Sequence, residues 1–391
     1  MWIYFLFFVA VFWAYNRSGK LSDNAQLNFL KLYLAGLALY VGLADMMGGY
    51  DRYIYSAHFD FIADLIYAQD YKSAYDSLFT EGKSTEWGFT LTYFIISFIT
   101  RNRYIYILIM TLIMYTLLFK SFKRYMRDYP MGIMLFLGLW FFFTFTYLRQ
   151  VMACSIVWLS IKYVVSRDFK RYLLLFIIAY LMHNSAVVFF PLYFVPMKKY
   201  SKMSVIIVMV FLLFVGLTNV AGNMFTVFGG LIGAEERTAH YSQESTAFRY
   251  EYIIEAALFL YVILQNYHLF RKENKQELVL MNMSLVFCGI LLLFCMNTQG
   301  GRLSWFYMIG LIATLTRITK TKKRFSQDNM AIILLSLLLF SRIVFTWDHL
   351  LSPYKTFLTD GVRDYDPTWE EYEYDHAYDD NKMYRDPWVL W

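Results

Sequence analysis

The sequence YIYILIMTLIMYTLLF at residues 104–119 decides the fold class, because it has no charged residue and lies between Arg103 and Lys120. A membrane-spanning helix needs roughly 20 mostly apolar residues. Backbone polar groups in a bilayer must be hydrogen-bonded within the segment, so this run predicts an α-helical span. Similar runs, the shorter of which must extend into polar flanks, lie at 2–15, 28–44, 131–148, 151–165, 203–221, 252–269, 278–296, 303–318 and 330–346.

The composition agrees with a membrane protein. Of the 391 residues, 59% are hydrophobic, 21% aromatic and 17% charged, whereas about 25% of residues in soluble domains are charged. The net charge of +6 comes from short basic clusters between apolar runs, so no nucleic-acid partner is expected. Cys154, Cys288 and Cys295 lie inside apolar runs and are predicted to be buried and unpaired.

The basic clusters predict the orientation, because cytoplasmic loops are enriched in Lys and Arg. They lie at 17–31, 120–127, 167–171, 198–202, 271–275 and 320–324. Placing all of them in the cytoplasm predicts about twelve spans in a bacterial inner (cytoplasmic) membrane, with both termini outside. No Lys or Arg precedes the apolar N-terminus, which is therefore predicted to be a retained helix rather than a cleaved signal peptide.

This topology requires that two apolar segments are not ordinary spans. Residues 89–100 lie between a long polar loop and two arginines, and are predicted to form an interfacial or re-entrant helix. Residues 172–195 must enter and leave the membrane within one stretch. They are predicted to form two short or tilted helices that meet at His183 and Asn184, at the outer face or in a cavity.

The long polar segments are predicted to lie outside. Outer loops at 45–103 and 222–251 belong to a single transmembrane domain at 1–346, followed by an acidic, aromatic periplasmic tail at 347–391. This composition favours a solvated and partly disordered tail. A carbohydrate-facing role for its aromatic residues is the alternative.

Polar residues at the outer ends of the spans form the candidate site, because ionisable groups in or beside spans are costly and usually functional. Arg149 and Gln150 lie in a tight turn, where the guanidinium could bind a phosphate through two hydrogen bonds; interfacial anchoring is the alternative. His183, beside Asn184 and Ser185, could act as a general base or a phosphate donor, or could be structural.

Other candidates come from the outer loops. Asp51 and Glu86, near the two ends of loop one, could converge on a sugar acceptor as a catalytic base, and Tyr53 could stack on its ring. Solvation or an ion pair with the neighbouring arginine is the alternative for these carboxylates. Arg302 follows two glycines that permit close approach of a ligand, and Arg249 could contact a lipid phosphate. Weaker candidates in loop two are Glu235, Glu236 and Arg237.

Several chemistries have no support in the sequence. It contains no P-loop, no GxGxxG dinucleotide fingerprint and no HExxH motif, and its Cys and His spacing offers no zinc site. Neither ATP hydrolysis nor metalloprotease chemistry is therefore expected.

The order of these features resembles the EpsG family of Wzy-like exopolysaccharide polymerases, over residues 1 to about 354. The most specific part is the Arg149-Gln150 pair, which is followed by His-x-Ser-Ala at 183–186. One departure is Trp87, where the family's acidic motif would have Pro. The segments that carry the resemblance are Tyr50-Asp51-Arg52-Tyr53, Glu86-Trp87-Gly88-Phe89, Tyr147-Leu148-Arg149-Gln150, Lys170-Arg171-Tyr172, residues 179–186 and Gly301-Arg302.

The resemblance implies an all-α polytopic fold similar to the GT-C membrane glycosyltransferases, with periplasmic loops. It implies a glycosyltransferase that joins undecaprenyl-diphosphate-linked oligosaccharide repeat units at the outer face of the membrane. The growing chain would pass from its lipid diphosphate to the non-reducing end of a new unit, without a nucleotide sugar, metal or other cofactor. A chain-length regulator and a flippase are candidate protein partners.

This chemistry gives each candidate residue a role. The leaving group is a diphosphate, so Arg149 and Arg302, with Arg249 in reserve, would neutralise its charge. The acceptor hydroxyl needs a base, for which His183 leads, followed by Asp51 or Glu86. The remaining substrate-binding candidates are Gln150, Tyr53, Asn184 and Ser185.

Two other functions fit the same pattern. A lipid-linked glycan ligase would transfer finished polymer to another lipid, and the sequence barely separates it from a polymerase. A polysaccharide flippase or transporter would typically show repeated halves and helices broken at mid-membrane. No internal repeat is visible, and the polar groups gather on the predicted outer side, which favours an enzyme.

Overall fold

The computed structural model describes residues 1–19, 21–80, 86–220, 222–223, 248–359, 362 and 367–388, and these residues form helices and loops without a strand. The helices are α1 (Trp2–Ser18), α2 (Asp23–Leu43), α3 (Tyr50–Tyr67), α4 (Tyr71–Tyr75), α5 (Trp87–Ser97), α6 (Arg103–Tyr125), α7 (Tyr129–Leu139), α8 (Leu148–Ser166), α9 (Phe169–Met182), α10 (Lys202–Leu217), α13 (Tyr250–Gln265), α14 (Lys275–Leu293), α15 (Gln299–Ser304), α16 (Met308–Lys320), α17 (Gln327–Thr346), α18 (Asp348–Leu351), α19 (Pro367–Tyr372) and α20 (Ala377–Asp380). Shorter turns are a π-helix at Asp76–Thr80 and 3-10 helices at Phe141–Thr144, Asn184–Phe194 (η3), Tyr267–Leu269 and Trp305–Tyr307.

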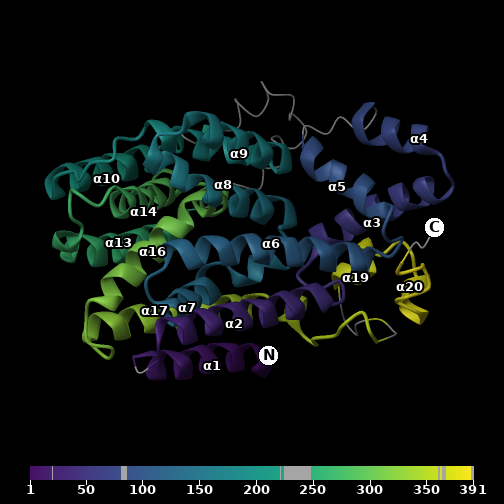
Figure 1. Cartoon of the computed structure of the whole chain (residues 1–391), viewed down its shortest axis with the longest axis horizontal. Helices are drawn as coiled ribbons and strands as arrows, with labels where there is room; N and C mark the ends of the chain where they lie inside the picture. The colour runs from purple at the N-terminus through teal and green to yellow at the C-terminus, as the bar shows by residue number, and fades with distance from the viewer. Residues whose placement is uncertain are drawn as a thin grey trace.

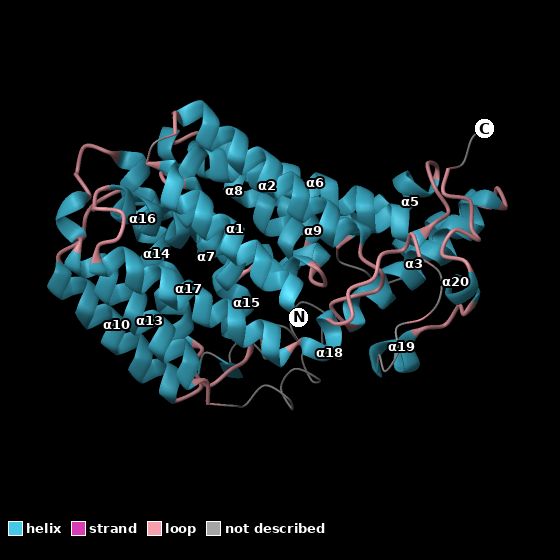
Figure 2. Ribbon diagram, turned by 90° about the horizontal axis from the view of Figure 1, so that it is seen from below, coloured by secondary structure: helices cyan, strands magenta, loops and turns pink. Residues whose placement is uncertain are grey.

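The helices pack into an elongated bundle. Helices α10, α13 and α14 lie at one end of its long axis, whereas α3, α4, α5, α19 and α20 lie at the other (Figure 1). The view from below shows the same division, with α18 near the N-terminus and α19 near α3 (Figure 2). The functional candidates are therefore carried by a long helical body and by a group of short helices at one end of it.

Five helices of the described residues are long and apolar enough to cross a membrane: α2, α6, α8, α14 and α17. The chain is therefore a membrane protein by the length and composition of its helices. The expected count of about twelve spans stays a prediction, since α1, α10, α13 and α16 are shorter than 18 residues.

Polar side chains cap the first turns of these helices, α6 one residue before the predicted run at 104–119 and α2 five residues before the one at 28–44. The Ser22 hydroxyl accepts the Ala25 N–H at the start of α2, and the Asn102 side chain accepts the N–H groups of Tyr104 and Ile105 at the start of α6. Such caps satisfy backbone donors that have no partner within the helix. The last turn of α6 contains basic residues, which favour a helix C-terminus.

Small residues allow the central helices to approach closely. A Cβ added at Gly138 of α7 would collide with the backbone oxygen of Ser336 in α17, and one added at Gly310 of α16 would collide with Met283 of α14. Membrane helices associate largely through this kind of packing, because lipid tails are as apolar as the side chains they contact.

The structure confirms two expectations about the short segments. The helix over 89–100 is α5 (Trp87–Ser97), only 11 residues long, and its interfacial or re-entrant placement stays a prediction. Within 172–195, α9 ends at Met182, His183 has an extended backbone (φ −157°, ψ 123°), and the 3-10 helix η3 follows. The three cysteines are also buried and unpaired, as predicted.

The prediction of one continuous span at 131–148 is wrong. Helix α7 ends at Leu139, and a 3-10 turn at Phe141–Thr144 separates it from α8. Trp140, Phe141, Phe142 and Phe145 are all fully buried. A straight helix would direct consecutive side chains to different sides, whereas the broken backbone lets all four rings enter the core.

The segment at 347–391 also differs from the expected solvated tail. Its described residues 367–388 pack against α3 and the start of α6, with Tyr378 fully buried and Lys382 3% exposed. Aromatic rings and ion pairs make these contacts. In the sequence, the residues that form them lie among many carboxylates.

The close helix contacts lead to a stability prediction. Gly138→Leu and Gly310→Leu should each destabilise the fold by about 1–3 kcal/mol or more, because the neighbouring backbone and side chains have no room to move. Thermal unfolding of the purified protein in detergent measures this. Gly36→Leu is the control, since nothing lies within 4 Å of a Cβ there. Equal unfolding temperatures for all three variants would contradict the packing argument.

Candidate active site

Glu86 joins three segments that are distant in the sequence. Its Oε2 lies 2.6 Å from Nη1 of Arg149, and its Oε1 lies 3.1 Å from Nδ1 of His183 and 3.3 Å from the backbone nitrogen of Asn184. Glu86 is only 3% exposed. A buried carboxylate is costly unless it is paired and hydrogen-bonded, so these contacts explain how Glu86 is tolerated.

The local sequence explains this convergence. Glu86 immediately precedes α5, and at Gly88 the helix approaches α9 so closely that an added Cβ would lie 2.9 Å from Cβ of Leu181. The end of α9 then places His183 and Asn184 beside Glu86. Arg149 occupies the first turn of α8, so its side chain reaches the same point.

A hydrogen-bonded chain continues from Arg149 to α3. Arg149 Nε donates to the Tyr55 hydroxyl at 3.2 Å, and Tyr55 donates to Oδ2 of Asp51 at 3.4 Å. Asp51 and Tyr55 are four residues apart on α3 and therefore share a face. Burial raises the pKa of Asp51, and the positive charges of Arg302 and Arg149 partly oppose this shift.

Gln150 and Arg302 form a second pair beside this chain. Arg302 Nε donates to Gln150 Oε1 at 3.0 Å, and Gln150 Nε2 donates to the Arg302 carbonyl oxygen at 2.8 Å. The Arg302 guanidinium also lies 4.7 Å from the ring centre of Tyr147. Because Gln150 follows Arg149 directly, the two arginines lie on neighbouring elements, and both act on Asp51.

The structure thus brings most predicted site residues together. Ser185 belongs to the cluster, since its hydroxyl lies 3.2 Å from Nδ1 of His183. Arg249 lies at the start of α13, where its N–H donates to the Cys295 carbonyl at 2.7 Å, and Tyr252 packs on the two glycines before Arg302. Arg249 is therefore near the segment that carries Arg302, without a described contact to Glu86. Residues 235–237 lie outside the described part of the chain.

Two expectations about loop one need correction. Tyr53 is 2% exposed and packs in the hydrophobic core, so its ring is not available to stack on a sugar. The arginine next to Asp51 is not its ion-pair partner, because Arg52 donates to the carbonyls of Val41, Ala44 and Phe145. Tyr55 was not predicted as a site residue, although its position four residues after Asp51 puts both side chains on one face of a helix.

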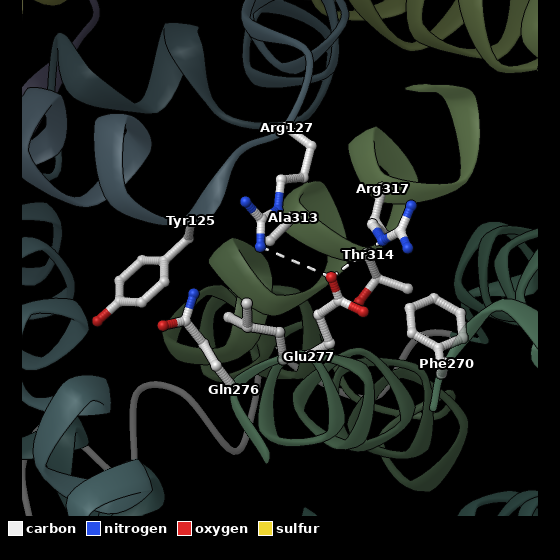
Figure 3. Close-up of a pocket in the computed structure, with 9 residues that line it drawn as sticks. Tyr125, Arg127, Phe270, Gln276, Glu277, Ala313, Thr314 and Arg317 are labelled. Carbon is white, nitrogen blue, oxygen red and sulfur yellow. Dashed lines mark hydrogen bonds and ion pairs between the residues drawn. The ribbon is translucent and has the colours of Figure 1, made fainter. Parts of the chain in front are cut away.

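Another charge cluster lies at the far end of α14 from Arg302. Glu277, in the first turn of α14, has Oε1 at 2.9 Å from Arg317 Nε and at 3.6 Å from Arg127 Nη2 (Figure 3). These ion pairs connect α14 to α16 and to the α6–α7 loop.

No group of three His, Cys, Asp or Glu side chains in the described residues could hold a metal ion.

Comparison with protein families matches residues 37–356 to the EpsG family. The chain belongs to this family. The match contains all the residues of the candidate cluster, from Asp51 to Arg302, whereas residues 367–388 lie beyond it. EpsG membership makes the chain a membrane protein related to exopolysaccharide polymerases. No curated protein and no solved structure matches it.

The Glu86 bridge leads to an energetic prediction. A double-mutant cycle of Glu86→Gln and Arg149→Gln, followed by unfolding in detergent, should give a coupling energy of about 1–3 kcal/mol, because one buried carboxylate is shared. The exposed pair of Asp168 and Arg171, at 3.4 Å, is the control and should give less than about 1 kcal/mol. Additive effects at Glu86 and Arg149 would show that the bridge carries no energy.

Proposed function

We propose that the protein is a polysaccharide polymerase that joins oligosaccharide repeat units linked to a polyprenyl (undecaprenyl) diphosphate at the outer face of the cytoplasmic membrane. One observation carries the proposal: Glu86 bridges Arg149 and His183, which puts a cation and a base on one buried carboxylate. Membership of the EpsG family supports the reaction class. The topology expected from the basic loops supports the outer location.

The reaction is a displacement at the first sugar of the growing chain. A hydroxyl at the non-reducing end of a new lipid-linked unit attacks the carbon of this sugar that carries the diphosphate. The bond from that carbon to the diphosphate oxygen breaks. The proton of the hydroxyl passes to a base, and the lipid diphosphate leaves with the bonding electrons. One lipid diphosphate is released for each glycosidic bond formed.

The two arginines suit the leaving group. A guanidinium has five N–H donors and matches phosphate oxygens in geometry. Glu86 and Tyr55 take two donors of Arg149, whose side chain is 27% exposed, so it is held at one edge while it can still reach a ligand. Arg302, aligned by Gln150 and Tyr147, adds a second positive charge nearby. Charge that develops on the diphosphate is best stabilised by such fixed cations.

His183 is our candidate for the base. Nδ1 of His183 lies 3.1 Å from Glu86 Oε1 and also 3.3 Å from the backbone nitrogen of Ser185, whose N–H can donate to it. In the tautomer that we assign to the active enzyme, Nδ1 carries the proton and donates it to Glu86 in place of accepting from Ser185. The neutral ring then has its lone pair on Nε2, the arrangement in which a carboxylate orients a catalytic imidazole. Glu86 itself accepts bonds from Arg149 and Asn184, so both of its oxygens are already engaged by protein donors. We assign Glu86 the role of orienting His183, and Asp51 that of holding Tyr55 against Arg149.

This proposal predicts a loss of polymer in cells. Host cells that lack the gene, complemented with Arg149→Ala or His183→Ala, should make about 10²–10⁴-fold less long polysaccharide and accumulate single lipid-linked units, because removing a fixed cation or a base slows the transfer step. Gel ladders of the polysaccharide measure this, with protein amounts checked by immunoblot of membranes.

The control is Arg171→Ala, which removes an exposed arginine from α9 without touching the cluster. Full-length polysaccharide from either site variant at normal protein levels would refute the assigned site. Accumulation of unattached polymer instead of single units would indicate a ligase.

A further inference from the structure

Buried charges connect residues 367–388 to the part of the chain that matches the family. Arg103, at the start of α6, is fully buried, and its Nη2 lies 2.7 Å from Oε2 of Glu373. Its Nη1 lies 3.7 Å from Oδ2 of Asp60 in α3, whose side chain is also buried. Arg103 and Asp60 lie within the match at 37–356, whereas Glu373 lies beyond it. A residue outside the family match therefore supplies a partner for a buried family-region cation.

Further contacts repeat this arrangement along α3. The hydroxyl groups of Tyr374 and Tyr378 both donate to the Asp60 carboxylate, the latter at 3.2 Å. Arg385 Nη1 lies 2.8 Å from Oδ1 of Asp64, one turn further along the helix. Both carboxylates of this face of α3 are thus held by side chains of residues 374–385.

The same segment also holds the loop before α3 and the loop before α6. The buried Lys382 lies 3.5 Å from Asp45, which precedes α3, and its carbonyl accepts a 2.8 Å hydrogen bond from the side chain of Asn102, which caps α6. At the first residue of α3, the ring of Tyr372 contacts Tyr50 edge to face, with centres 4.6 Å apart. Tyr50 is the neighbour of Asp51.

Helix geometry places these contacts behind the candidate site. Asp60 is nine residues after Asp51, about two and a half turns at 3.6 residues per turn. Asp60 and Asp64 therefore face away from Asp51 and Tyr55, which point toward Arg149. Residues 367–388 hold the back of α3, and its front carries one end of the hydrogen-bonded chain that leads to Glu86.

We propose that residues 367–388 are a positioning element of the active site, which sets the rotation and position of α3 and thereby the position of Tyr55 and Arg149. This inference rests on the proposed polymerase function. A buried ion network adds little stability compared with apolar packing of the same volume, but it defines one geometry. Displacements of about 1 Å can reduce turnover by about a hundredfold.

The test measures turnover in membrane vesicles supplied with lipid-linked oligosaccharide extracted from host cells that lack the gene. The first variant is Glu373→Gln, which removes the charge opposite Arg103. Its control is Glu370→Gln, an exposed carboxylate of α19. A double variant, Arg103→Gln with Glu373→Gln, removes both charges, so that no unpaired buried cation destabilises the fold. Tyr374→Phe removes one hydroxyl from Asp60 and is the mildest change.

We expect the double variant and Tyr374→Phe to keep normal protein levels and unfolding temperatures. We also expect kcat to fall at least tenfold in the double variant and at least threefold in Tyr374→Phe, with KM for the lipid-linked unit changed less than twofold. Glu370→Gln should behave like the unmodified protein. Normal kcat in the double variant and in Tyr374→Phe would overturn the proposal and leave the segment a purely stabilising role.

Arg149→Ala in the same vesicles separates the two proposals. If Arg149→Ala abolishes turnover while the segment variants are normal, the polymerase site stands and the positioning role fails. If Arg149→Ala retains normal turnover, the proposed site fails, and the positioning role that depends on it fails with it.

Discussion

The arrangement of the candidate site depends on one buried carboxylate. Glu86 is almost inaccessible to solvent, so its charge must be compensated by protein groups. Arg149 from the start of α8, and His183 with the Asn184 N–H from the break after α9, provide this compensation. The requirement holds the short helix α5 against α8 and α9, and Gly88 makes the approach possible.

Much of the fold could be predicted because membrane helices follow simple physical rules. Apolar runs located the long helices, and the short limbs on either side of His183 indicated the break between α9 and η3. The run at 131–148 misled because hydrophobicity does not report backbone direction, and a tight turn rich in aromatic residues is as apolar as a helix. Segment 367–388 misled for the opposite reason, since its carboxylates suggested solvation, whereas Glu373 is paired with the buried Arg103 and the buried Tyr378 donates to Asp60.

The residues of the candidate site were predicted better than the contacts between them. Asp51, Glu86, Arg149, Gln150, His183 and Arg302 were all named from their polar character beside apolar runs, and the structure brings them into contact. Which of them pair could not be derived, because the pairs join residues about 60 to 150 positions apart. Tyr53 and Tyr55 illustrate the limit: two tyrosines on one helix have opposite roles, which are set by the face that each occupies. Helix α3 has one face toward the site and the other held by residues beyond the family match.

The central claim is that this cluster transfers a glycan from one lipid diphosphate to another lipid-linked unit. The most direct measurement uses the purified protein in liposomes with lipid-linked oligosaccharide from host cells that lack the gene, and counts both glycosidic bonds formed and lipid diphosphate released. The account predicts chain growth without added nucleotide sugar, with one lipid diphosphate released per bond. Movement of the lipid-linked unit across the bilayer with neither chain growth nor diphosphate release would contradict it.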